Sequence, residues 1–333
     1  MSREFLLLVQ ESAYKTPVAS PSVYNYGSSP PSTPSAFYMR LDGANVFTMR
    51  PRPVMVAVPY GGGVAIDAFR VSDKIECKGK LVTKLYAGPL SQFLLQWAAQ
   101  QINTGQTSPW TTTEPAGDLA SVAIYHAIAR SDGSIKRRVY LGCKVDGWDV
   151  EVSEDGTIAT LSIDLSASTP QGNQFDSSTD PAGTVFPAPV DSPNQMPINP
   201  YLFIHASGGL TVGTVRSTFQ SIKISSKNQL ARRFWANRFV NLMRFVGRST
   251  TLDAVNFYAS TPDDRTSYEG LTTETTSFAL NNGTHSVTFT LNTASVITTF
   301  EDQLPLNDLY TQTMTVTNQW DPTAGSDLAL TFT

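Results

Sequence analysis

The chain has 333 residues, of which 41% are hydrophobic and only 16% are charged, and its formal net charge is -4. The length suits two ordinary domains, and the low charged fraction favours strands and turns over exposed helices. The net charge provides no general attraction to DNA or to an anionic membrane, and no segment has the pattern of a membrane span or a secretion signal.

The first segments in chain order alternate apolar and polar residues. Residues 18–36 are rich in Pro, Ser and Tyr, which favours an extended arm. A hairpin is predicted around the glycine-rich turn that begins at Tyr60, and a further strand over residues 75–86. Cys77 in this strand and Cys143 later in the chain are too few for a disulfide framework. We therefore expect buried thiols and synthesis in a reducing cytoplasm.

One amphipathic helix follows the strand. Pro89 is suited to the first turn of a helix, and Gly105 lies beyond its expected end. The apolar residues of this segment share one face, which should pack on a sheet: Leu90, Phe93, Leu94, Trp97 and Ala98.

Two hairpins are predicted next. The first joins strands at residues 122–125 and 139–140 and carries Lys136, Arg137 and Arg138 close to its turn. The second turns at residues 154–156 and returns with apolar residues at alternate positions as far as Leu165. Strong alternation of this kind indicates strands with one buried face.

The alternation stops at residues 170–200, which contain seven prolines. We place an interdomain linker at residues 181–200, between a first domain at residues 1–180 and a second at residues 201–333. The second domain again predicts strands, at residues 218–224, 250–257, 314–316 and 328–332, with a hairpin at Asn282-Gly283.

Short segments of the two halves match each other. Residues 163–170 match residues 255–262 at an offset of 92, and residues 150–153 match residues 222–225 at an offset of 72. Duplication is the simplest explanation, and chance similarity of two hairpins is the alternative. The difference in offset places about 20 extra residues in the second copy, within residues 226–247.

Three sequence segments resemble those of tandem-domain tail tube proteins of siphophages: residues 11–17 (ESAYKTP), residues 201–206 leading into 210–213 (YLFIHA, LTVG) and residues 218–225 (TFQSIKIS). The resemblance implies a mainly β chain of two duplicated β-sandwich or barrel domains, each with a short flanking helix and hairpin or loop arms.

The same resemblance implies a structural virion protein that self-assembles into stacked trimeric, pseudo-hexameric rings, the conduit for DNA ejection. Its partners would be further copies of itself, the tape measure, terminator and distal tail proteins, and DNA in transit, but no membrane. Assembly in the host cytoplasm would follow. The alternative is another virion component, such as a tail terminator or a receptor-binding or carbohydrate-binding β-sandwich at the tail tip.

No residue pattern indicates an enzyme, a cofactor or a metal. His126, His205 and His285 lack the spacing of metal ligands. The glycines at 61–63 and 208–209 are not followed by the Gly-Lys-Ser/Thr of a phosphate loop, and paired acidic residues lie at predicted turns, where solvated charge is usual. We expect a non-catalytic protein.

Charge is unevenly distributed in the second half. Between Asp191 and Asp253 there are eight basic residues and no acidic ones, whereas ten acidic residues and only Arg265 follow from Asp253 onward. The basic segment could bind DNA, or it could dock on an acidic surface of a neighbouring subunit. We favour docking, because many phosphate contacts would hold DNA that must slide, whereas unlike surfaces can join copies into rings or stacks.

The candidate contacts for such docking are basic and aromatic residues on three segments: Arg232, Arg233, Phe234, Trp235 and Arg238 in the basic segment, Lys136, Arg137 and Arg138 near one hairpin turn, and Tyr60 at another. The alternative for the aromatic residues is packing inside a short helix over residues 229–245.

Overall fold

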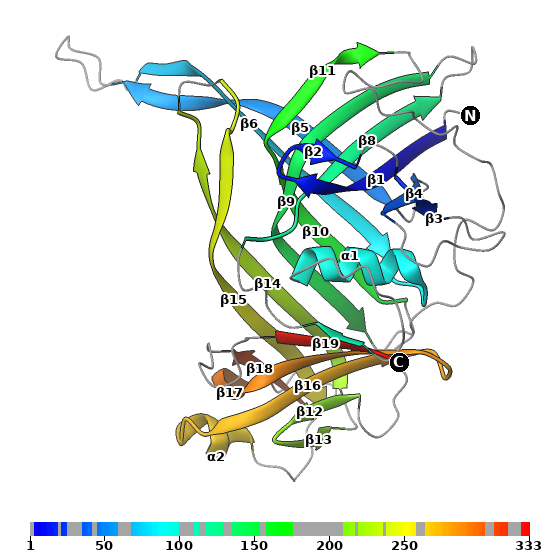
Figure 1. Cartoon of the computed structure of the whole chain (residues 1–333). Coiled ribbons are helices and arrows are strands. Elements are labelled where there is room, and N and C mark those ends of the chain that lie inside the picture. Colours follow the sequence, from blue (N-terminus) through cyan, green and yellow to red (C-terminus); the bar gives the residue numbers. More distant parts are fainter. Residues whose placement is uncertain are drawn as a thin grey trace.

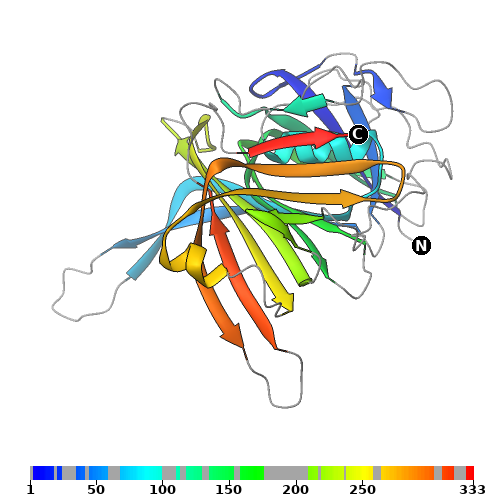
Figure 2. The same ribbon diagram turned by 90° about the horizontal axis from the view of Figure 1, so that it is seen from below.

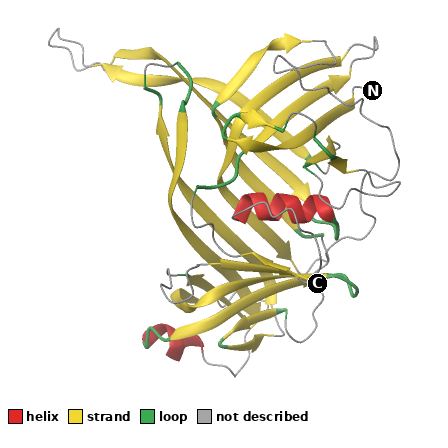
Figure 3. Ribbon diagram, viewed as in Figure 1, coloured by secondary structure: helices red, strands yellow, loops and turns green. Residues whose placement is uncertain are grey.

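The computed structural model describes residues 3–18, 21–24, 35–41, 45–58, 68–99, 110–112, 118–129, 135–153, 158–175, 209–216, 219–235, 238–257, 264–303, 310–318 and 328–333. Within these ranges the chain is mainly β, as predicted, and Figure 3 shows how few residues are helical. The helices are α1 (Pro89–Ala99) and α2 (Asp264–Glu269).

The strands of the first half are β1 (Arg3–Ala13), β2 (Thr16–Pro17), β3 (Val23–Tyr24), β4 (Ala36–Leu41), β5 (Val46–Val58), β6 (Ala68–Lys84), β7 (Trp110–Thr112), β8 (Val122–Ala129), β9 (Ile135–Ser153), β10 (Thr160–Ala167) and β11 (Thr169–Phe175). Those of the second half are β12 (Leu210–Val212), β13 (Thr214–Arg216), β14 (Phe219–Arg233), β15 (Leu242–Phe257), β16 (Thr273–Asn281), β17 (Ser286–Gln303), β18 (Thr311–Thr317) and β19 (Leu328–Phe332).

Eight strands from both halves form one large antiparallel sheet. Its order is β5-β6-β10-β9-β14-β15-β18-β17. Figure 1 labels these strands, and Figure 2 shows the molecule from below. The first part of β17 turns away to pair with β16 and β19. A second sheet of the first half contains β4, β1, β8, the first part of β9 and β11.

Strand β9 belongs to both sheets of the first half. Its residues 135–143 pair with β8, and its residues 144–151 pair with β10. Gly142 lies at the change of sheet with a φ of 63°, a conformation that glycine adopts at little cost. A Cβ there would lie 2.9 Å from Cε2 of Tyr14. The bend therefore requires glycine.

Helix α1 lies between the two sheets of the first half (Figure 1). The predicted face is buried, with Trp97 fully enclosed, and the rings of Phe93 and Phe37 on β4 are 4.6 Å apart. The buried apolar cluster continues into the second half, where the rings of Trp148 and Phe289 are 6.1 Å apart. Burial in one continuous cluster joins the halves.

The predicted hairpins are confirmed at β8–β9, β9–β10 and β16–β17. The pairing of β5 with β6 is confirmed as well, and residues 59–67 between these strands lie outside the described residues. The further strand predicted over residues 75–86 is part of β6, which ends at Lys84. The linker at residues 181–200 and most of the arm at residues 18–36 also lie outside them.

Two expectations are corrected. The suggested helix over residues 229–245 is wrong, because β14 continues to Arg233 and β15 starts at Leu242, paired from Arg233↔Leu242 inward. Alternating burial along these strands replaces the helical spacing: Met243 faces inward and Arg244 outward. The aperiodic region also starts later than expected, because β11 occupies Thr169–Phe175 against β9.

The pairing pattern of the first half recurs in the second. The pairs β5–β6, β6–β10, β10–β9 and β9–β8 correspond to β14–β15, β15–β18, β18–β17 and β17–β16. Helix α1 follows β6 as α2 follows β15. This correspondence corrects both sequence matches. Residues 150–153 and 222–225 are neighbours in the sheet, with Glu151 opposite Lys223. Residues 163–167 lie on β10, the counterpart of β18, whereas residues 255–257 lie on β15, the counterpart of β6, so the insertion inferred from the two offsets does not follow.

Candidate assembly surfaces

The outer ends of β14 and β15, which we call the arm (residues 228–247), rise beyond the large sheet toward the β5–β6 hairpin (Figure 1). Its inner face is held by the rest of the subunit. Arg232 donates from Nη2 to a carboxylate oxygen of Asp146 and, at 2.8 Å, to Oγ of Ser166. The charge of Arg232 is therefore neutralised within the subunit.

Two lysines of the first half bind carbonyl groups of the arm. Lys15 Nζ donates to the Val240 carbonyl at 3.0 Å, and Lys144 Nζ donates to the Met243 carbonyl at 2.8 Å. Lys144 also pairs with Asp118 at 2.5 Å. Burial lowers the pKa of Lys144, although Asp118 opposes this effect. A buried cation with a carboxylate partner and a carbonyl acceptor fixes the outer half of the arm to the first half of the chain.

The Glu11 carboxylate organises the same region from the predicted motif at residues 11–17. It accepts hydrogen bonds from the backbone N–H of Lys15 at 2.9 Å, from the backbone N–H of Gly142 at 2.7 Å and from the Ser121 hydroxyl. Burial raises the pKa of Glu11, and these hydrogen bonds oppose the shift. Glu11 thus ties the end of β1 to the bend of β9.

The ring of Tyr14 completes this motif beneath the two lysines. The Nζ atoms of Lys15 and Lys144 lie 5.4 and 5.1 Å from its centroid, within the range of cation–π attraction. Burial raises the pKa of Tyr14 to about 12. Sequence reasoning used the motif only as a sign of resemblance and missed its structural role, since its partners Ser121, Gly142 and Lys144 are more than 100 residues away.

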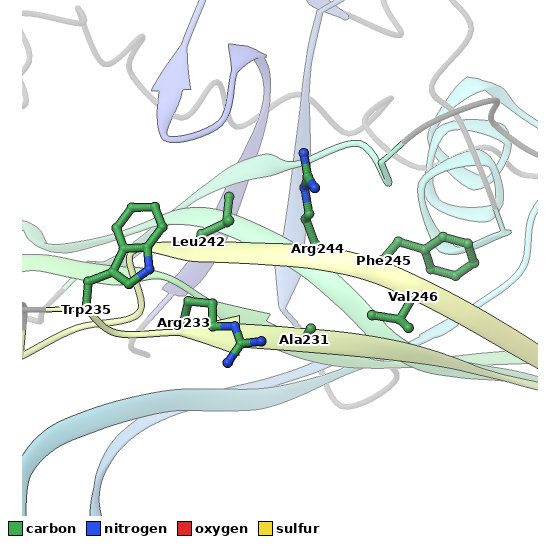
Figure 4. A pocket seen from close by; sticks show the side chains of 7 residues that line it. All are labelled: Ala231, Arg233, Trp235, Leu242, Arg244, Phe245 and Val246. Atoms are coloured by element: carbon green, nitrogen blue, oxygen red, sulfur yellow. The ribbon is translucent and has the colours of Figure 1, made fainter.

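The outer face of the arm is open. Figure 4 shows the side chains that line a shallow hollow of about 570 Å³ on it, which we call the arm face: Ala231, Arg233, Trp235, Leu242, Arg244, Phe245 and Val246. Trp235 is 68% exposed and Val246 65% exposed. Exposed aromatic and arginine side chains together are typical of protein interfaces.

The other predicted contact residues are dispersed. Lys74 Nζ on β6 lies 5.4 Å from the centroid of the Phe234 ring, and the carbonyl of Arg238 accepts from the Ile75 N–H at 2.8 Å, so both hold the arm tip on β6. Arg138 is exposed on β9 in the second sheet.

Lys136 and Arg137 pair with β8 through their backbones, and Tyr60 lies outside the described residues. Of the predicted set, the structure brings Arg233 and Trp235 together on one open surface.

The two ends of the large sheet are a second candidate surface. Among the described residues, β5 pairs with β6 only, and residues 299–303 of β17 pair with β18 only. Arg50 and Arg52 are exposed on one edge, and Glu301 and Asp302 on the other. Open edges bearing opposite charges can join copies of one chain.

The described residues contain no group of three potential metal-ligating side chains, and neither described helix has the length and apolar character needed to span a bilayer. Cys77 and Cys143 are free and buried as predicted, and burial raises the pKa of Cys77 to about 12. Such thiols are unreactive.

The chain was compared with protein families and with curated proteins. The family model described as phage tail tube protein covers residues 1–321. No curated protein matches the chain significantly.

Proposed function

Because the chain belongs to the phage tail tube protein family, we propose that three copies of this structural protein of the phage tail close into a ring, and that stacked rings enclose the channel for the genome. The modules are residues 1–180 and 201–333, joined by the linker at residues 181–200. Three copies then supply six modules around one axis, as the resemblance to tandem-domain proteins implies.

The recurring order of strands carries the proposal. The order β5-β6-β10-β9 is followed in the same sheet by its counterpart β14-β15-β18-β17. One subunit therefore contains a junction between modules, at β9–β14. Among the described residues, the corresponding edges, residues 299–303 of β17 and strand β5, have a strand partner on one side only. Repetition of the same junction between subunits would continue the sheet around a ring and cover both edges.

We assign the polar face of the large sheet to the channel. Lys223 on this face lies 3.5 Å from a carboxylate oxygen of Asp149 and 4.0 Å from one of Glu151. Four threonines of β18 alternate with its buried residues: Thr311, Thr313, Thr315 and Thr317. A wall of hydroxyls and paired charges releases few counterions from DNA, so the genome can slide past it.

We assign the arm face to contact between stacked rings. Its arginines and Trp235 would dock on the next ring, and at the ends of the tube the stacking surfaces would meet the terminator and distal tail proteins. The tape measure protein would occupy the channel before DNA does. Assembly would take place in the host cytoplasm.

Electron microscopy of the purified protein tests the proposed function. We expect hollow tubes built of rings with three-fold symmetry, either spontaneously or when tail assembly factors are added. Monodisperse monomers under all of these conditions would contradict it.

Removal of the exposed anchor of the arm face should stop stacking. In the double variant Trp235→Ala/Arg233→Gln we expect rings without long tubes, and a critical concentration for tubes raised by about 30-fold or more, because a central Trp contributes about 2 kcal/mol or more. Sedimentation and electron microscopy measure both.

The matched control for this variant is Arg265→Gln. Arg265 is also an exposed arginine, but it lies on α2 and pairs with Glu269 at 2.8 Å. We expect this variant to form tubes of normal length. Equal tube formation by the arm variant and the control would remove the arm face from the assembly.

A further inference from the structure

We propose, on the basis of the function above, that residues 299–303 of β17 pair antiparallel with residues 48–52 of β5 in the next copy, with Glu301 opposite Arg50. The partner is a second copy of this chain, and the contact is a register-specific strand pair. The internal β9–β14 junction is the template.

The register follows from irregularities shared by the two modules. Strand β9 has one extra residue, Asp146, facing β10, and β17 has one extra residue, Thr298, facing β18. Asp149 and Glu301 each lie three residues beyond the extra residue. The two residues are therefore equivalent positions at the open side of their modules.

The same comparison identifies the partner on the next strand. In the first module, Asp164 on β10 pairs with Lys80 on β6, and Lys80 pairs with Thr48 on β5. In the second module, Thr315 on β18 pairs with Asp253 on β15, and Asp253 pairs with Lys223 on β14.

Thr48 on β5 therefore corresponds to Lys223 on β14, and Arg50 corresponds to Ser225. Because Asp149 pairs with Ser225 in the internal junction, Glu301 should pair with Arg50.

Charge supports this register. In the internal junction, acidic residues of β9 lie beside a basic residue of β14, as the contacts of Lys223 with Asp149 and Glu151 show. The free edge of β17 is likewise acidic and exposed at Glu301, and the free edge of β5 is basic and exposed at Arg50. Oppositely charged residues that face each other across strands stabilise the pair, and a slip of one residue would move Glu301 and Arg50 to opposite faces of the sheet.

Pro51 makes the proposed junction weaker than its internal template. It lies in β5 opposite Phe300 in this register, and proline cannot donate a ladder hydrogen bond. Proline on an edge strand also discourages pairing with unrelated strands. Charge matching at Glu301 and Arg50 would then contribute much of the specificity for a second copy.

Disulfide formation tests the register in the full chain. In the variant Thr48→Cys/Gln303→Cys the new thiols would be directly opposite each other between subunits, close enough to oxidise. In the control Thr48→Cys/Thr299→Cys they would be about 13 Å apart along the strand. The buried Cys77 and Cys143 provide no background.

We expect the first variant to give covalent dimers and trimers, and no larger species, on non-reducing gels, and the control to remain monomeric. Tubes in the microscope without this crosslink, or with equal crosslinking of both variants, would overturn the junction and leave the proposed function standing. Absence of rings, tubes and crosslinks in the parent and in both cysteine variants would overturn the junction and the proposed function together.

Reversal of charge provides a second test that leaves the strands intact. Arg50→Glu and Glu301→Arg should each raise the critical concentration for assembly by about tenfold, and the double variant should return it to within about threefold of the parent. Circular dichroism verifies folding. A double variant no better than the single ones would count against the pairing of these two residues.

Discussion

The variant Gly79→Ala should yield no stably folded subunit. A Cβ at this position would lie 2.0 Å from the carbonyl oxygen of Thr48 and 2.8 Å from Cα of Met49, both in the backbone of β5. Backbone atoms of a paired strand cannot move aside without breaking the ladder between β5 and β6. We expect a loss of about 3 kcal/mol or more in the free energy of unfolding, measured by denaturant titration and by the soluble fraction on expression.

Gly247→Ala is the matched control, because Gly247 also lies in a strand of a long hairpin. The nearest atom to its added Cβ is Oε1 of Gln229 at 3.7 Å, an ordinary contact. The substitution should change the free energy of unfolding by about 1 kcal/mol or less. A similar loss in both variants would show that strand glycines are needed for another reason than close approach at Gly79.

Glu11→Ala should be the most damaging change to a charged residue. It leaves the N–H groups of Lys15 and Gly142 and the Ser121 hydroxyl without their buried acceptor, at a cost of about 3 kcal/mol or more. Because Glu11 also positions the turn that holds the arm, we expect tube formation to fail together with stability. Thermal unfolding and electron microscopy measure the two effects.

Glu11→Gln removes the ionisable group and keeps an acceptor at only one of the two oxygen positions, because the other becomes an NH2 donor. Burial raises the pKa of Glu11 above its ordinary value of 4.5. The folded state therefore holds the proton more tightly, and the carboxyl contributes stability below that value which is lost as the pH rises through the folded-state pKa. Glutamine does not titrate. The stability of Glu11→Gln relative to the parent should rise from about pH 4 to about pH 8, and parallel pH profiles would contradict this.

Local patterns in the sequence were sufficient for the elements themselves. Helix α1 was predicted because Leu90, Phe93 and Trp97 recur at helical spacing after Pro89. The hairpin at Asn282-Gly283 was predicted because its turn residues stand between two alternating runs. These signals depend on residues close together in the chain.

The assembly surfaces could be predicted only in part. The uneven charge of the second half identified the segment that forms the arm, and Arg233 and Trp235 do share an open face. Arg232 differs from them because side chains of a strand alternate, which turns it toward Asp146. The sequence did not discriminate between a strand and a helix for this segment. In a strand, a shift of one residue in the pairing register changes which arginines are exposed.

The sequence by itself determined that this is a mainly β chain with one well-packed helix and a polarised second half, since periodicity and composition are local properties. Only the tertiary structure decided which strands are neighbours. The pairing of β9 with β14, the correspondence of β9 with β17, and the open edges at Arg50 and Glu301 join residues far apart in the chain. Such pairings depend on how a whole sheet buries its apolar face, and no short stretch of residues encodes that arrangement.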